Sequence, residues 1–178
     1  MAIKLYPVKT RPGMKKKIKR NIDNLRKQFP PQEYPIVLDV GAREGYAVYW
    51  LRKYGYDALG METEKKYCSP IILHGNFLEE RLREETYNIV LSRHSLEHIE
   101  LENEDGTERF LNNCHQILCP GGILYLIVPI SQWWEFYCGT KKRGSNGFEY
   151  LSTLIKSAGF DIIKERNREN ALFVCRKK

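Results

Sequence analysis

The sequence predicts an α/β protein with a doubly wound, mostly parallel sheet of seven strands. The apolar run at residues 36–38 ends at Asp39 and leads at once into a turn that contains Gly41 and Gly45. Such a run followed by a tight turn is typical of a buried parallel strand. Further apolar runs then alternate with amphipathic segments as far as the C-terminus. This alternation favours a parallel sheet that is covered by helices on both faces.

A helix is predicted before the first strand. Its apolar residues recur at helical spacing, and Pro30 and Pro31 end it. The apolar stripe consists of Met14, Ile18, Ile22, Leu25 and Phe29. We expect this stripe to lie on the body of the protein, and we divide the chain into an N-terminal arm, residues 1–31, and a main domain, residues 32–178.

The next elements follow in chain order. Residues 46–54 form a helix that presents Ala47, Trp50, Leu51 and Tyr54 on one face, and short strands follow at residues 58–62 and 71–73. The connection between these two strands is too short for an ordinary crossover helix, so we expect an extended loop or one turn of helix there.

The C-terminal half continues the pattern with a strand at residues 88–91. A helix starts at Asp105 with Glu108, buries Phe110, Leu111, Cys114, Ile117 and Leu118, and ends at Pro120. Gly121 and Gly122 turn the chain into a strand at residues 123–128. A last helix turns Leu151, Leu154, Ile155 and Ala158 inward and stops at Gly159. Residues 161–164 and 171–175 form a terminal hairpin.

The positive charge is concentrated in the N-terminal arm. Residues 1–29 contain ten Lys or Arg against a single acid, Asp23, so the rest of the chain has a net charge of −2 within the total of +7. The cluster consists of Lys15, Lys16, Lys17, Lys19 and Arg20. Its basic face either is solvated or meets a nucleic acid or another anionic surface.

We expect a soluble intracellular protein. The sequence contains nothing that resembles a signal peptide, and no apolar run approaches the roughly 20 residues of a membrane span. Its five cysteines are widely spaced and form no C-x-x-C pair. We therefore expect free thiols, no zinc site and a cytoplasmic location, and oligomeric state stays open.

An ordered set of motifs points to a family. Asp39-Val40-Gly41-Ala42-Arg43-Glu44-Gly45 is followed by the acid Glu62, by Leu96-Glu97-His98 and by Leu118-Cys119-Pro120-Gly121-Gly122. This set resembles the class I S-adenosylmethionine-dependent methyltransferases, especially the small-molecule type. The resemblance implies a Rossmann-like fold whose last strand inserts antiparallel beside the fifth. It also implies S-adenosylmethionine as the cofactor and S-adenosylhomocysteine as the product.

The same resemblance implies a set of cofactor-binding residues. They are Asp39, Gly41, Ala42, Arg43, Gly45, Glu62, Asn76, Phe77 and Ser92. Glu62 would hold the ribose hydroxyls, while Asn76 and Phe77 would border the adenine. The glycine loop would wrap the methionine portion, with Asp39 orienting the loop and Ser92 beneath the reactive methyl group. Arg43 stands where the family has a glycine, so its side chain must turn outward or contact the cofactor.

Catalytic and acceptor residues are less sharply indicated. His94 is a candidate general base because histidine titrates near neutrality, and a packing role is the alternative. His94, Glu97 and His98 have the spacing of metal ligands on a helix, but no convincing further ligand exists, so we expect no metal. Trp133 and Trp134 either stack on the acceptor or cover the cofactor.

The function that these patterns favour is methyl transfer to an unidentified acceptor, either a small molecule or a nucleic acid. The alternative is a non-catalytic nucleic-acid-binding module that uses its basic helix. An NAD-dependent oxidoreductase fits poorly because the loop lacks the G-x-G-x-x-G spacing.

Overall fold

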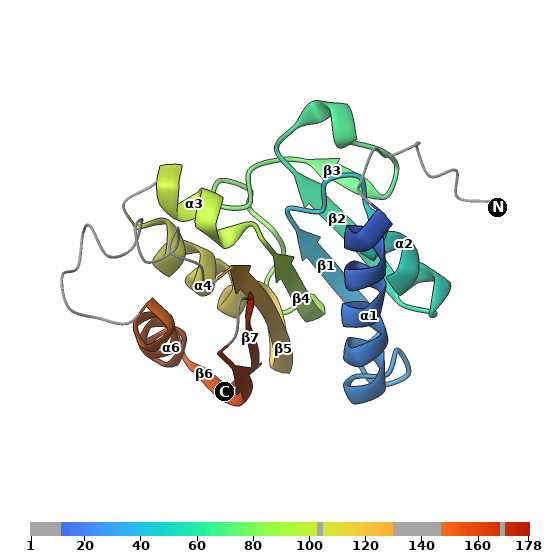
Figure 1. Ribbon diagram of the computed structural model, residues 1–178. Helices are drawn as coiled ribbons and strands as arrows, with labels where there is room; N and C mark the ends of the chain where they lie inside the picture. Colours follow the sequence, from blue (N-terminus) through green and yellow to red (C-terminus); the bar gives the residue numbers. More distant parts are fainter. Residues whose placement is uncertain (1–11, 103–104, 130–146, 168–169) are drawn as a thin grey trace.

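The computed structural model describes residues 12–102, 105–129, 147–167 and 170–178 (Figure 1). These residues form one seven-stranded sheet in the order β3-β2-β1-β4-β5-β7-β6. The strands are β1 (Ile36–Val40), β2 (Asp57–Glu62), β3 (Ile72–His74), β4 (Tyr87–Arg93), β5 (Leu118–Pro129), β6 (Phe160–Arg166) and β7 (Asn170–Lys177). Strands β1 to β5 pair in parallel, and β7 is antiparallel to both β5 and β6. The predicted fold class and the inserted last strand are confirmed.

Helices cover both faces of the sheet. One layer contains α1 (Pro12–Gln28) and α2 (Tyr46–Lys53), and the other contains α3 (Leu96–Glu102), α4 (Gly106–Ile117) and α6 (Gly147–Ser157). Successive strand residues point to opposite faces. In β4, Ile89 and Leu91 therefore join the core beneath α1 and α2, whereas Val90 joins the core beneath α4 and α6. No helix within the described ranges is long and apolar enough to cross a membrane.

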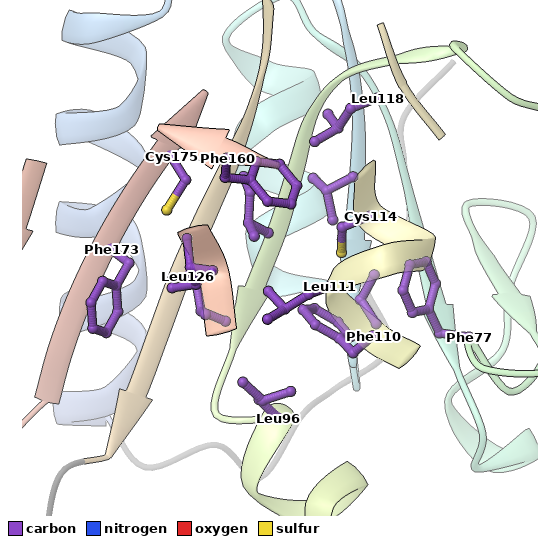
Figure 2. Close-up of a cluster of buried hydrophobic side chains, with 14 of the residues drawn as sticks. Phe77, Leu96, Phe110, Leu111, Cys114, Leu118, Leu126, Phe160, Phe173 and Cys175 are labelled. Atoms are coloured by element: carbon purple, nitrogen blue, oxygen red, sulfur yellow. The ribbon is translucent and has the colours of Figure 1, made fainter. Parts of the chain in front are cut away.

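The core beneath α4 and α6 is built on aromatic and aliphatic side chains (Figure 2). Phe110 and Leu111 are fully buried there, as predicted, and the Phe110 ring lies 5.3 Å from that of Phe77. Cys114 and Cys175 are also fully buried, and desolvation raises the pKa of both thiols. These cysteines therefore act as small apolar residues of the core.

Helix α1 belongs to the opposite core. Ile18, Ile22, Leu25 and Phe29 of its predicted stripe are buried against the sheet and α2. Met14 was wrongly included in that stripe, because 42% of its surface is exposed. At this end of the helix the neighbouring aromatic ring, that of Tyr46, is covered by the Lys15 ammonium group instead.

Three connections differ in detail from the expectations. The short link between β2 and β3 contains one 3-10 turn, η1 (Lys65–Tyr67), which decides between the two alternatives left open. Strand β5 begins at residue 118 rather than 123, because β4 pairs with it on both sides of a bulge that holds the Pro-Gly-Gly segment. Asp105 precedes α4 but makes no capping hydrogen bond. Its carboxylate lies 3.8 Å from the Arg109 guanidinium instead.

The burial of α1 predicts a large difference between two substitutions in one helix. Leu25→Ala should lower the free energy of unfolding by about 2–5 kcal/mol, because it leaves a cavity in a fully buried site. Met14→Ala should change it by less than about 0.5 kcal/mol, as is usual at exposed positions. Urea unfolding of both variants measures the difference. Equal effects would mean that α1 is not anchored as described.

Candidate functional site

Three charged side chains meet on one face of the sheet at its carboxyl edge. In the parallel register Asp39 lies opposite Gly60 of β2 and Leu91 of β4. Glu62 and Arg93 come two residues after these partners, and side chains two residues apart point to the same face. Asp39, Glu62 and Arg93 therefore lie on neighbouring strands beneath the loop that joins β1 to α2.

Glu62 organises the backbone around it. Its Oε2 atom accepts a hydrogen bond of 2.8 Å from the Arg43 N–H, in the middle of the loop. Its Oε1 atom accepts bonds of 2.9 Å from the Thr63 N–H and 3.2 Å from the Glu64 N–H, and a further one from the Thr63 hydroxyl. Only 8% of the Glu62 surface is exposed. A carboxylate has about four acceptor positions, so Oε2 retains capacity for another donor.

Two glycines shape the loop above Glu62. Gly41 has φ +75°, and a Cβ atom there would lie 2.0 Å from the Ser95 Oγ atom, whose hydroxyl donates to the Val40 carbonyl. Gly45 has φ +72°, and a Cβ atom there would lie 2.4 Å from Ile72 Cδ1. Both positions exclude larger residues by conformation and by space. The loop backbone is therefore held close to the ends of β1, β2 and β4.

Arg43 occupies the middle of this loop with φ +46°, a left-handed conformation that is unfavourable for a side-chain-bearing residue. The hydrogen bond to Glu62 Oε2 stabilises this conformation. Its side chain is exposed and so turns outward, one of the two arrangements expected for a residue in place of glycine. The Ala42 N–H, next to it, donates to the Met61 carbonyl at 3.1 Å.

Asp39 is almost completely buried, with 4% of its surface exposed. Burial raises the pKa of its carboxyl group to about 7, the nearby Arg93 charge opposes that rise, and Glu62 adds to it. The loop hydrogen bonds described above go to Glu62 and Met61, so in this structure the loop orientation comes from them. Sequence reasoning missed Arg93, although a charged residue that ends an apolar strand was a usable signal.

The end of β4 and the start of α3 contribute unpaired polar groups. Ser92 is fully buried, and its Oγ atom has no hydrogen-bond partner among the described residues. His94 has φ +56°, its N–H donates to the Ile127 carbonyl at 2.9 Å, and its Nδ1 atom lies 3.5 Å from Glu97 Oε1. Glu97 Oε2 is buried and likewise unpaired within the described part of the chain. Buried polar atoms of this kind usually have partners, so they suit a polar ligand.

The remaining expected residues divide into three groups. Asn76 is half-buried and forms a local turn, in which its Oδ1 atom accepts from the Leu78 N–H at 3.1 Å. The Phe77 ring points into the core beside Phe110 (Figure 2), so only its backbone is available to border a ligand. Trp133 and Trp134 lie outside the described residues.

A search for metal-binding geometry gave no candidate. Among the described residues, no cluster of three or more His, Cys, Asp or Glu side chains could hold a metal ion. His94 and Glu97 do lie together, whereas His98 is exposed on the same helix. The absence of a bound metal in the working protein stays a prediction.

Comparison with known proteins identifies what this fold resembles. A family model described as a methyltransferase domain matches residues 13–165. A search of curated proteins found no match. Among solved structures, a protein from Pyrococcus horikoshii has a TM-score of 0.76 at 14% sequence identity, with 95% of this chain and 93% of that chain covered.

Two further solved structures have a similar fold. A SAM-dependent methyltransferase from Archaeoglobus fulgidus has a TM-score of 0.71 at 13% identity, with 92% of this chain and 94% of that chain covered. A putative methyltransferase from Haloferax volcanii, solved in complex with a methyltransferase activator, has a TM-score of 0.69 at 16% identity, and the coverage is 92% and 91%. At these identities the structures establish the fold.

The burial of Asp39 predicts how stability depends on pH. Its folded-state pKa of about 7 lies above the ordinary pKa of 3.8 for an aspartic acid, so the folded protein holds this proton more tightly than the unfolded chain. The stabilisation is present below pH 4 and is lost as pH rises through 7, by roughly 4 kcal/mol at about 1.4 kcal/mol per pKa unit. Asp39→Asn should remove this loss and be more stable than the parent at pH 8.

Urea unfolding at several pH values measures the effect. Asp161→Asn, at an exposed position of β6, is the matched control and should keep the parent's pH dependence. If the parent and Asp39→Asn showed the same dependence of unfolding free energy on pH, burial would not raise the pKa of Asp39.

Proposed function

The chain belongs to the class I S-adenosylmethionine-dependent methyltransferase family, and from this premise we propose that the edge formed by β2, β1 and β4 binds the cofactor and receives the acceptor. The observation that carries this assignment is the Glu62 carboxylate, which is anchored to the glycine loop and keeps acceptor capacity on Oε2. In open α/β sheets ligands bind outside the carboxyl ends of the strands, where the strand order reverses. Here that point lies between β1 and β4.

The chemical groups of the site residues match those of the cofactor. S-adenosylmethionine supplies a methyl group that is activated by a positively charged sulfur atom. Glu62 is suited to the ribose hydroxyls, and the backbone of residues 41–45 can approach the methionine portion closely because Gly41 and Gly45 carry no side chain. The unpaired Glu97 Oε2, and the Ser92 Oγ on the opposite face of β4 from Arg93, are further candidates for polar contacts. Negative charge on Glu97 would favour a cationic ligand.

For the acceptor we propose that His94 takes up the proton. When the acceptor atom gains the methyl group it loses a proton, and a histidine that is hydrogen-bonded through one nitrogen can accept that proton on the other. The Nδ1 atom of His94 faces Glu97 Oε1 at 3.5 Å, which leaves Nε2 for the acceptor. Glu97 would act as the positioning residue. Trp133 and Trp134 remain the candidates for contact with the acceptor.

The acceptor class and the cellular location are also proposals. A small molecule and a nucleic acid both suit an open sheet edge. A reducing compartment such as the cytoplasm is supported by Cys68, Cys114, Cys119 and Cys175, which are all free thiols.

The cofactor assignment predicts that substitution of Glu62 weakens the binding of S-adenosylhomocysteine. S-adenosylhomocysteine should raise the melting temperature of the parent, because a ligand that binds only the folded state stabilises it. Glu62→Ala should weaken that binding by about 1–3 kcal/mol, the usual range for lost hydrogen bonds to a charged group. Glu64→Ala, two residues further on and exposed, is the control and should bind as the parent does. Equal affinity in all three proteins would remove Glu62 from the site.

The proposed base predicts a second effect, on turnover. With labelled S-adenosylmethionine and a cell extract as the source of acceptors, His94→Gln should lower methyl incorporation by about 100-fold or more. His98→Gln changes an exposed histidine of α3, four residues further on, and should leave incorporation unchanged. If His94→Gln kept the parent's rate and pH profile, the histidine would be a packing residue instead.

A further inference from the structure

Helix α1 carries far more positive charge than its surroundings neutralise. Among residues 12–28 there are seven Lys or Arg and one acid, Asp23. Asp23 accepts a hydrogen bond of 2.9 Å from Lys19 Nζ and another from the Tyr54 hydroxyl, and the Lys19 contact lowers the pKa of the Asp23 carboxyl. The outward-facing cations are Lys16, Lys17, Arg20 and Lys27, all exposed and without an ion pair among the described residues.

The other cations of α1 fix the helix to α2. Lys19 Nζ lies 4.7 Å from the centre of the Trp50 ring, and the Arg26 guanidinium lies 4.7 Å from that of Tyr54. Lys53 of α2 also lies over the Trp50 ring, at 4.8 Å from its centre. These ring faces are therefore occupied by cations and are not free to stack on nucleic-acid bases. What α1 offers to a partner is charge alone.

The exposed cations form a stripe that starts beside the functional site. Lys16 and Lys27 are eleven residues apart, which corresponds to about 17 Å along a helix. At the N-terminal end of the stripe Lys15 lies over the ring of Tyr46, the first residue of α2 after Gly45. Figure 1 shows α1, dark blue at its first turn, alongside α2. The stripe thus begins at the glycine loop and runs away from it.

We propose that this stripe binds the phosphate backbone of a nucleic acid and holds it next to the methyl-transfer site. The proposal rests on the proposed function and names its acceptor class. A row of unneutralised cations on one helix is the electrostatic footprint of a polyanion partner. A membrane surface fits less well, because a helix that binds lipid inserts its apolar face. The apolar face of α1 is already buried in the core through Ile18, Ile22 and Leu25.

The test measures binding of a labelled single-stranded RNA and a labelled DNA duplex by fluorescence anisotropy over a range of salt concentrations. Each phosphate contact contributes a slope of about −0.7 for single strands and −0.9 for duplexes in log affinity against log salt. Combining Lys16→Glu, Lys17→Glu and Arg20→Glu should reduce the slope by about 2 for RNA and weaken binding on the order of 100-fold at low salt. The stronger-binding probe identifies the type of nucleic acid.

A matched control separates this surface from overall charge. Arg81→Glu, Arg83→Glu and Lys156→Glu change the net charge by the same amount at exposed positions outside α1, and they should retain most of the binding. Equal loss in both triple variants, no binding to either probe at low salt, or binding that ignores salt would overturn the proposal. Binding only to vesicles that contain phosphatidylserine would overturn it in favour of a membrane surface.

The thermal shift with S-adenosylhomocysteine, measured on the same three proteins, keeps the two proposals distinct. We expect it to be the same in all of them, because the apolar stripe and the glycine loop are unchanged. A parent that binds RNA through α1 but shows no shift would contradict the proposed cofactor site and leave the stripe as a nucleic-acid surface. A thermal shift without RNA binding would support the proposed cofactor site and contradict the nucleic-acid surface on α1.

Discussion

The parallel register of β2, β1 and β4 is the constraint on which the site depends. It brings Asp39, Glu62 and Arg93 to one face at one edge, where water has largely been excluded. Glu62 is compensated by three backbone N–H groups and a hydroxyl, whereas Asp39 relies on the field of Arg93, and its pKa rises. An edge that carries incompletely compensated negative charge is prepared for a positively charged ligand.

Two of the three described non-glycine residues with positive φ lie at the same edge, and the third, Glu85, precedes β4. Arg43 and His94 both have left-handed conformations, and they lie in the loops that follow β1 and β4, the two strands between which the strand order reverses. Each is held by a hydrogen bond from its own N–H, to Glu62 and to Ile127 respectively. Strain of this kind persists only where its surroundings enforce it, and it is concentrated at functional sites. The geometry of both loops is therefore a property of the assembled sheet.

This dependence explains which features the sequence could predict. The apolar runs of β1 and β4 and the glycine turn are local patterns, so they were recognised without knowledge of neighbours. The position of Arg93 at the end of an apolar strand is a local signal, but its proximity to Asp39 arises only from strand pairing. The burial of the Phe77 ring was not predicted for a similar reason, because its partner Phe110 is distant in sequence. Met14 fitted the helical period but lies beyond the part of α1 that the sheet covers, as its exposure shows.

Helix α1 shows how one segment can meet two demands without conflict. The apolar stripe of α1 packs on the core, and its cations contact rings of α2. These two sets of contacts fix the position of α1 on the sheet. Because the helix is fixed in this way, the direction and starting point of its exposed cations relative to Gly45 are fixed as well. A freely moving basic tail would attract a polyanion equally well but would not orient it. Burial of one face of α1 thus gives the charge on its other face a defined position beside the site.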